Sequence, residues 1–172
     1  MKILVTGSTG FIGAALCKAL LNQGHSVRAF HRSTSTLKLL EGLPVEHVLG
    51  DLTVTPSVDE AVQGMDVVFH AAAHLGNRRT QSGRMYAVTV EGTRAVLNAA
   101  RRAGVQRVVH TSSVAALGMP ERPGSTGLMD ENHSWNYRAD RWPYGYAKHL
   151  AEMEVQKAVA QGLDAVIVNP AY

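Results

Sequence analysis

Tyr144 and Lys148 are four residues apart in a segment with a helical pattern, so both side chains are expected on one face of a helix. A free tyrosine has a pKa near roughly 10 and is a poor base at neutral pH. A lysine cation one turn away favours the phenolate, so the pair could exchange a proton with a substrate oxygen. Tyr137 and Tyr146 have no lysine four residues on. Because tyrosine and lysine are common on helices, the spacing alone could also be structural.

A second candidate site is the segment GSTGFIG (residues 7–13), which lies between a buried-strand run and a helical pattern. Its glycines would allow a tight turn and a close approach of the backbone to a pyrophosphate, and the helix N-terminus would supply unpaired N–H groups. The expected cofactor contacts are Gly7, Thr9, Gly10, Phe11, Ile12 and Gly13. The alternative is a glycine turn that only packs helix on sheet, a role that Gly13 is expected to have as well.

The end of the strand predicted over residues 27–30 indicates which nicotinamide dinucleotide would bind. It reads RAFHRS (residues 28–33), with no acidic residue before Glu41. A site for NAD usually has a carboxylate here for the ribose 2′-hydroxyl, whereas a guanidinium and hydroxyls suit the 2′-phosphate of NADP. The sequence therefore favours NADP over NAD, with Arg32 as the main contact and Ser33 as a helper. The alternative is that Arg32 is an exposed loop residue.

Alternating strands and helices must position these residues. Short apolar runs predict strands at residues 2–6, 27–30, 45–49, 66–70, 107–111 and 165–168. Helical patterns predict helices at 11–23, 36–41, 56–63, 82–103 and 142–161, with a loop over 118–140. The alternation predicts an α/β fold with a doubly wound parallel sheet (Rossmann fold). The expected strand order is 3-2-1-4-5-6, with the ligand crevice at the carboxyl ends of the strands.

Residues 6–13 (TGSTGFIG) have G-x-x-G-x-x-G spacing and resemble the fingerprint of the extended short-chain dehydrogenase/reductase family. Further matches follow in the family's order: Asp51-Leu52, Ala71-Ala72-Ala73, Gly92-Thr93, Ser112-Ser113, Tyr144 with Lys148, and Asn169-Pro170. Together they cover nearly the whole chain. Arg32 and the run HTSSVAALG (residues 110–118) are most similar to the branch of dihydroflavonol-reductase-like proteins and NAD-dependent epimerases/dehydratases.

The resemblance implies roles for individual residues. Asp51 and Leu52 would contact the adenine, while Ala71, Ala72, Ala73 and Pro170 would line the cofactor site. Tyr144 and Lys148 would also touch the cofactor, with Lys148 on the nicotinamide ribose. Ser113 would orient the substrate oxygen, because it lies five residues before Gly118, as the family serine does. Thr89 stands where the family commonly has an asparagine that is associated with a water-linked proton relay.

These features favour an NADP-dependent oxidoreductase that acts on a carbonyl or alcohol of a small molecule. One alternative is a nucleotide-sugar epimerase or dehydratase that holds its NAD(P) tightly. Family dehydratases usually have an acidic residue beside the catalytic serine, where Val114 stands here. Another alternative is a non-catalytic NADP sensor that binds a partner protein, although such relatives lose the Tyr–Lys pair. A homodimer is also expected.

Other side chains are expected to be structural. His70 and His74 have i, i+4 spacing but straddle a strand end without a neighbouring carboxylate, so His70 is predicted to lie in the core and no metal site is expected. Cys17 is predicted to be an inert buried thiol. Trp135, Tyr137 and Trp142 would wall the substrate pocket or, alternatively, form a cluster that holds a loop in place.

Composition and length limit the class of protein. The chain has 172 residues, of which 45% are hydrophobic and 18% charged, which excludes a disordered or low-complexity chain. Its single cysteine and the lack of a long apolar run predict a cytoplasmic protein that does not span a membrane. The net charge of +3 comes from scattered basic residues, so no nucleic-acid partner is expected. Because extended family members are roughly twice as long, residues 1–172 are expected to be one cofactor-binding domain with the substrate-binding part missing.

Overall fold

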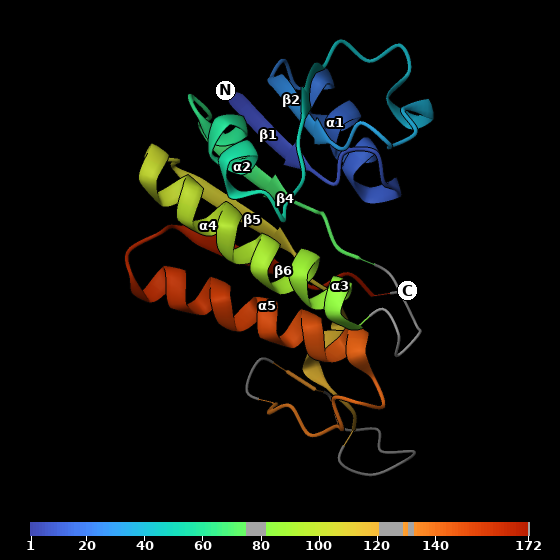
Figure 1. Ribbon diagram of the computed structural model, residues 1–172. Coiled ribbons are helices and arrows are strands. Elements are labelled where there is room, and N and C mark those ends of the chain that lie inside the picture. Colours follow the sequence, from blue (N-terminus) through green and yellow to red (C-terminus); the bar gives the residue numbers. More distant parts are fainter. Residues whose placement is uncertain (75–81, 121–128, 131–132, 172) are drawn as a thin grey trace.

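The computed structural model describes residues 1–74, 82–120, 129–130 and 133–171. Within these ranges the sheet consists of β1 (Lys2–Thr6), β2 (Ser26–His31), β3 (Glu46–Leu49), β4 (Val67–His70), β5 (Arg107–Thr111) and β6 (Ala165–Val168). All neighbouring strands pair in parallel, in the order β3-β2-β1-β4-β5-β6 (Figure 1). The α/β class and the strand order predicted from the alternation are therefore confirmed.

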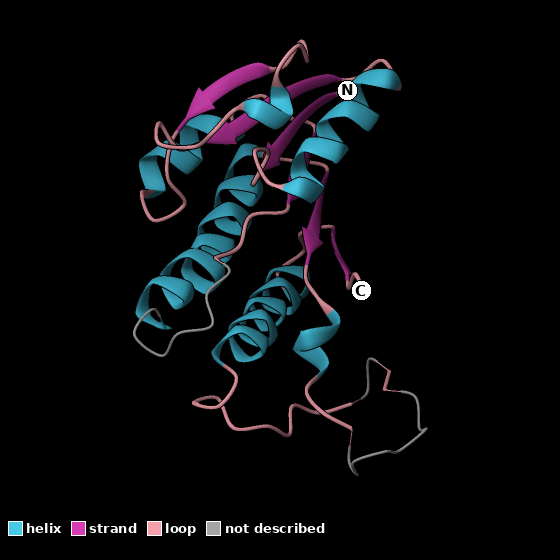
Figure 2. Ribbon diagram, turned by 90° about the vertical axis from the view of Figure 1, so that its right-hand side faces the viewer, coloured by secondary structure: helices cyan, strands magenta, loops and turns pink. Residues whose placement is uncertain are grey.

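Helices cover both faces of the sheet (Figures 1 and 2). One face carries α1 (Phe11–Asn22) and the 3-10 helix η1 (Lys38–Leu40), and the other carries α2 (Thr55–Val62), α4 (Gly92–Ala103) and α5 (Pro143–Ala160). Side chains of β1 pack against the helices on both faces of the sheet, because successive side chains of a strand point to opposite faces. Ile3 and Val5 pack with Cys17 of α1, whereas Leu4 belongs to the cluster that contains Val96 of α4.

The helix predicted over residues 82–103 is divided into three parts. It begins as α3 (Ser82–Tyr86), widens to a π-helical turn η3 (Ala87–Glu91) and continues as α4. It ends at Gly104, which has a left-handed φ of 70°. A single π-helical turn shifts the apolar pattern too little for periodicity to reveal it.

Two further differences concern short elements. The helix predicted at 36–41 is only the single turn η1, since Gly42 and Pro44 follow it closely. A 3-10 helix that the sequence patterns did not predict, η4 (Val114–Leu117), follows β5. The predicted loop at 118–140 lies partly outside the described residues, and its described part forms no helix or strand.

Strand β6 is covered on one face only, as far as the described residues show. Ala165 and Ile167 pack against the cluster under α4 and α5. Val166 and Val168 point the other way and keep 40% and 43% of their surface exposed. No helix in the described ranges is both long and apolar enough to cross a bilayer.

Candidate functional site

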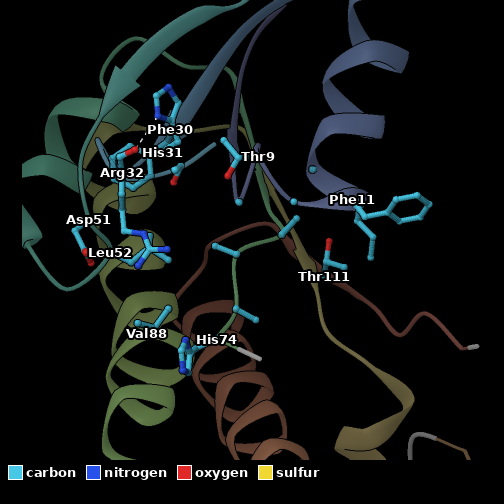
Figure 3. Close-up of a pocket in the computed structure, with 18 of the residues that line it drawn as sticks. Thr9, Phe11, Phe30, His31, Arg32, Asp51, Leu52, His74, Val88 and Thr111 are labelled. Atoms are coloured by element: carbon cyan, nitrogen blue, oxygen red, sulfur yellow. Dashed lines mark hydrogen bonds between the residues drawn. The ribbon is translucent and has the colours of Figure 1, made fainter. Parts of the chain in front are cut away.

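A cavity of about 440 Å³ lies at the carboxyl ends of the strands (Figure 3). Its lining includes most of the expected site residues: Gly7, Thr9, Gly10, Phe11, Ile12, Gly13, Arg32, Asp51, Leu52, Ala71, Ala72, Ala73, Tyr144 and Lys148. Ser33, Ser113 and Pro170 are not among the described residues that line it. The cavity is also lined by residues for which the sequence predicted no site role, including Ser35, His74, Val88, Thr111 and Ser112. Parallel strands explain the convergence, because their carboxyl ends share one edge of the sheet.

The glycine segment forms a tight turn between β1 and α1. The Gly10 amide donates to the Gly7 carbonyl over 2.9 Å, and Gly7 has a φ of 70°. A β-carbon on Gly7 would lie 2.7 Å from the Ala72 Cα, so the turn touches the segment after β4 directly. No side chain caps the start of α1, and its first turn has no acidic residue. The first amides of the helix therefore stay available for an anion.

Arg32 and Asp51 lie on the same side of the cavity (Figure 3). The backbone amide of Thr53 holds the pKa of the Asp51 carboxyl below its usual range, and the charge of Arg32 contributes to this shift. The Arg32 side chain is exposed, while its carbonyl lies 3.1 Å from His31 Nδ1. His31 Nε2 in turn lies 3.0 Å from His47 Nδ1 on the neighbouring strand. The turn that carries Arg32 is thus tied to β3.

Lys148 is buried in the floor of the site. It is 3% exposed, and its Nζ donates to the Thr111 carbonyl at the end of β5 over 2.9 Å. Burial lowers the pKa of Lys148 to about 8, against the opposing effect of Glu152. Tyr144 lies one turn earlier on α5 and is half-buried. Both side chains line the cavity, as their spacing predicts.

Ser112 and Ser113 have different surroundings. Ser113 Oγ accepts a hydrogen bond from the Ala115 amide over 3.2 Å and so caps η4. Ser112 lines the cavity, and its buried Oγ has no hydrogen-bond partner among the described residues. An unpartnered hydroxyl that lines a cavity is available to a ligand. Ser113 is expected to be the catalytic serine because of its position in the family pattern. That pattern does not show that Ser112, and not Ser113, lines the cavity with an unpartnered hydroxyl.

His70 lies in the core, as predicted, where it is 1% exposed between sheet and helices. Burial, with the nearby Lys148 cation, lowers the pKa of His70 to about 3. His110 on β5 lies beside it, with a distance of 5.2 Å between ring centroids. Burial also holds the pKa of His110 well below its usual range, and neither of its ring nitrogens has a partner among the described residues. Both imidazoles are therefore neutral at physiological pH.

The aromatic residues before α5 pack on one another and on that helix. Trp135 stacks on His149 with a centroid distance of 5.3 Å, and its ring lies 6.1 Å from that of Trp142. Tyr137 meets Trp142 edge to face. None of these side chains is among the described residues that line the cavity. Of the two expectations, the arrangement fits a cluster that holds the loop in place.

Metal binding and thiol chemistry find little support in the described residues. No group of three histidine, cysteine, aspartate or glutamate side chains in the described ranges is placed to hold a metal ion. Cys17 is fully buried, and burial raises the pKa of its thiol to about 11. The predicted buried position is confirmed, and a thiol with so high a pKa carries little thiolate at neutral pH.

The fold and the glycine turn together define a Rossmann-fold protein of the extended short-chain dehydrogenase/reductase type. The chain belongs to the NAD dependent epimerase/dehydratase family, whose model matches residues 3–172.

Named relatives include reductases. Over 171 residues the chain is 40% identical to "Sterol demethylase protein B" of Methylococcus capsulatus, covering 99% of this chain and 51% of the relative. It is 40% identical over 166 residues to a "Putative dihydroflavonol 4-reductase" of Synechocystis, covering 96% and 47%. A short-chain dehydrogenase/reductase superfamily protein from Agrobacterium tumefaciens, solved with bound NAD, is 36% identical with a TM-score of 0.82, covering 98% and 48%. The chain thus spans about half the length of the curated relatives it matches.

Proposed function

We propose that the protein is an NADP-dependent oxidoreductase that interconverts a carbonyl and an alcohol in a small molecule. The observation that carries the proposal is that one cavity is lined by the glycine turn, Arg32, Tyr144 and Lys148. Reduction of a carbonyl by a nicotinamide dinucleotide needs an anion site for the pyrophosphate and a group that gives a proton to the substrate oxygen. Residues with the chemistry for both line this one cavity, which supports the proposal. The reductases among the relatives support the same reaction class.

The residues present fit a nicotinamide dinucleotide. No side chain caps the start of α1, so its first amides are open to a pyrophosphate, and the hydroxyl of Ser112, which lines the cavity, is buried without a partner among the described residues. In this proposal Arg32 and Ser33 bind the 2′-phosphate, and Asp51 and Leu52 flank the adenine. The cofactor site also includes Gly7, Thr9, Gly10, Phe11, Ile12, Gly13, Ala71, Ala72, Ala73 and Pro170. When bound, the nicotinamide supplies hydride transfer.

Tyr144, Lys148 and Ser113 form the proposed proton-transfer site. Tyr144 gives a proton to the substrate oxygen in the direction of reduction and takes it back in oxidation. Lys148 lies one turn away as a desolvated cation below pH 8, so its field on the phenol is weakly screened and favours phenolate. Ser113 donates to the substrate oxygen and orients it. Thr111 keeps the lysine in place through its carbonyl.

The test is a cofactor titration followed by a turnover assay on the full-length protein. NADPH and NADH fluorescence would give the two dissociation constants, and NADPH oxidation would be followed over a panel of aldehydes and ketones. The proposal expects tighter binding of NADPH and turnover of at least one carbonyl. A more than tenfold preference for NADH would refute the cofactor assignment, and tight NADPH binding without turnover would favour the sensor.

A nucleotide-sugar epimerase is the second candidate, because the matching family model is that of epimerases and dehydratases. Such an enzyme would retain its cofactor through purification, and the absorbance of the purified protein would show it. We propose a homodimer in the cytoplasm for either activity. Sedimentation equilibrium and fractionation of cells would test these two points.

A further inference from the structure

We propose that Thr89 and Thr93 are positioning residues for the cofactor, because they hold both ends of the segment made by Ala71, Ala72 and Ala73. This role rests on the proposed function, in which that segment lines the cofactor site. The two threonines lie four residues apart where η3 passes into α4. Thr89 is 1% exposed and Thr93 is fully buried.

The first end of the segment is held through His70. Thr93 Oγ1 donates its only hydrogen to the Thr89 carbonyl over 2.6 Å. In its 2.9 Å contact with His70 Nε2, Thr93 Oγ1 must therefore be the acceptor, so His70 carries its proton on Nε2. Neutral His70 then accepts at Nδ1, where Thr6 Oγ1 donates over 2.6 Å. One chain of hydrogen bonds thus runs from β1 through β4 to the helix.

The second end of the segment is held at His74. The His74 amide donates to Thr89 Oγ1 over 3.2 Å. His74 lines the cavity next to Val88 (Figure 3), and its buried Nε2 has no partner among the described residues. The hydrogen bond therefore fixes the backbone of His74, which carries this cavity-lining imidazole. Thr89 thus accepts a hydrogen bond at each of its two oxygens, from Thr93 Oγ1 at its carbonyl and from the His74 amide at its Oγ1.

The segment has little freedom to move without changing the cavity. Gly7 packs against it so closely that a β-carbon there would lie 2.7 Å from the Ala72 amide nitrogen. A shift of the segment by a fraction of an ångström would thus reach the glycine turn. Thr89 replaces the asparagine that the resemblance associates with a proton relay. Because the Thr89 oxygens accept hydrogen bonds from the His74 amide and from Thr93 Oγ1, the structure assigns this position to placement of the cofactor.

The experiment measures NADPH binding to the full-length protein and to four variants, Thr89→Val, Thr89→Ser, Thr93→Val and Thr93→Ser. Valine keeps the shape and removes the hydroxyl, whereas serine restores the hydroxyl. We expect the dissociation constant to rise roughly 3- to 10-fold in each valine variant, as for loss of one hydrogen bond. The serine variants should stay within about twofold of wild type. Thr36→Val, at an exposed position, is the matched control and should change nothing.

A second readout follows the hydrogen-bond chain itself. Nitrogen NMR of the His70 ring should report the neutral Nε2–H tautomer in the wild type and in Thr93→Ser, but not in Thr93→Val. If Thr93→Val does not fold, Thr89→Val decides the question, since it leaves the buried His70 contacts in place. Folded valine variants that bind NADPH as wild type does would overturn the positioning role alone. A wild type that binds neither NADPH nor NADH would overturn the proposed function and this role together.

Discussion

A β-carbon on Gly13 would lie 2.1 Å from the carbonyl oxygen of Gly7, so the start of α1 and the end of β1 touch backbone to backbone. Gly13→Ala must push the helix away from the turn whose amides we propose to face the pyrophosphate. We expect loss of cofactor binding by at least tenfold and a destabilisation of about 2 kcal/mol or more, as for overpacking. Calorimetry and NADPH titration measure the two effects.

The matched control for this change is Gly83→Ala. Gly83 lies in α3, is exposed, and a β-carbon there would meet nothing within 4 Å. Alanine is the better helix former, so the control should bind cofactor normally and unfold at the same or a higher temperature. Normal NADPH binding by Gly13→Ala would contradict the assignment of the glycine turn.

Arg32→Ala should change cofactor selectivity and leave the fold intact. Loss of a charge-assisted contact with the 2′-phosphate should weaken NADPH binding roughly 10- to 100-fold. NADH binding should change less than about threefold, because NADH lacks that phosphate. Arg101→Ala, which removes the same charge in the last turn of α4, should affect neither ligand. An equal loss for NADPH and NADH would rule out recognition of the 2′-phosphate.

Lys148→Met should abolish turnover and stabilise the cofactor-free protein at neutral pH. Burial lowers the pKa of Lys148 from 10.5 to about 8, so below pH 8 the folded state carries the whole cost of desolvating the cation. That cost corresponds to about 3 kcal/mol and disappears between pH 8 and 10.5, where the folded protein releases a proton that the unfolded chain retains. Urea denaturation at pH 7 and at pH 10.5 measures the difference.

The lost hydrogen bond to Thr111 lowers the gain from Lys148→Met at both pH values. The pH dependence of the difference between variant and wild type is therefore the decisive quantity. An unchanged difference from pH 7 to pH 10.5 would mean that Lys148 keeps an ordinary pKa in the folded protein.

His70→Asn should make the protein less sensitive to acid. Because the pKa of His70 is lowered to about 3, the unfolded chain binds a proton between pH 6.5 and 3 that the folded protein excludes. The free energy of unfolding therefore falls as the pH drops below 6.5, by about 1 to 2 kcal/mol down to pH 5 from this residue. His70→Asn should flatten that slope. Equal slopes for the wild type and His70→Asn would show that the pKa of His70 is not lowered in the folded protein.

Ser113→Ala and Ser112→Ala should separate the two serines. Ser113→Ala should reduce kcat roughly 100-fold, as for removal of an oxyanion donor, and destabilise by about 1 kcal/mol because η4 loses its cap. Ser112 Oγ has no partner among the described residues, so Ser112→Ala should leave stability unchanged and lower kcat less than tenfold. The opposite ranking of kcat would transfer the role to Ser112.

The sequence predicted the strand order and most of the cavity lining, since each motif directly follows a strand. Gly7, Arg32, Asp51 and Ala71 come together because parallel strands end at one edge of the sheet. That inference needs only periodicity and the direction of the chain. The positions of Ser33 and Ser113 relative to the cavity depend instead on side-chain direction in a turn, which motif spacing does not encode.

The hydrogen bonds that join Thr93 to His70 and Thr89 to His74 also could not be predicted from the sequence. The hydroxyl of Thr93 meets His70 because the start of α4, directly after η3, packs on β4. Such a contact joins residues 23 positions apart and has no local signature. The neutral state of His70 is likewise a product of burial in three dimensions, and the predicted core position was its only trace in the sequence.

The pairing of Thr6 with His70 has a consequence for how the chain is made. The two residues are 64 positions apart, yet the turn after β1 is completed only when the segment after β4 packs on Gly7. During synthesis the glycine turn therefore leaves the ribosome long before the segment after β4 that packs on it. We therefore expect β1 and β4 to pair before the turn after β1 is complete.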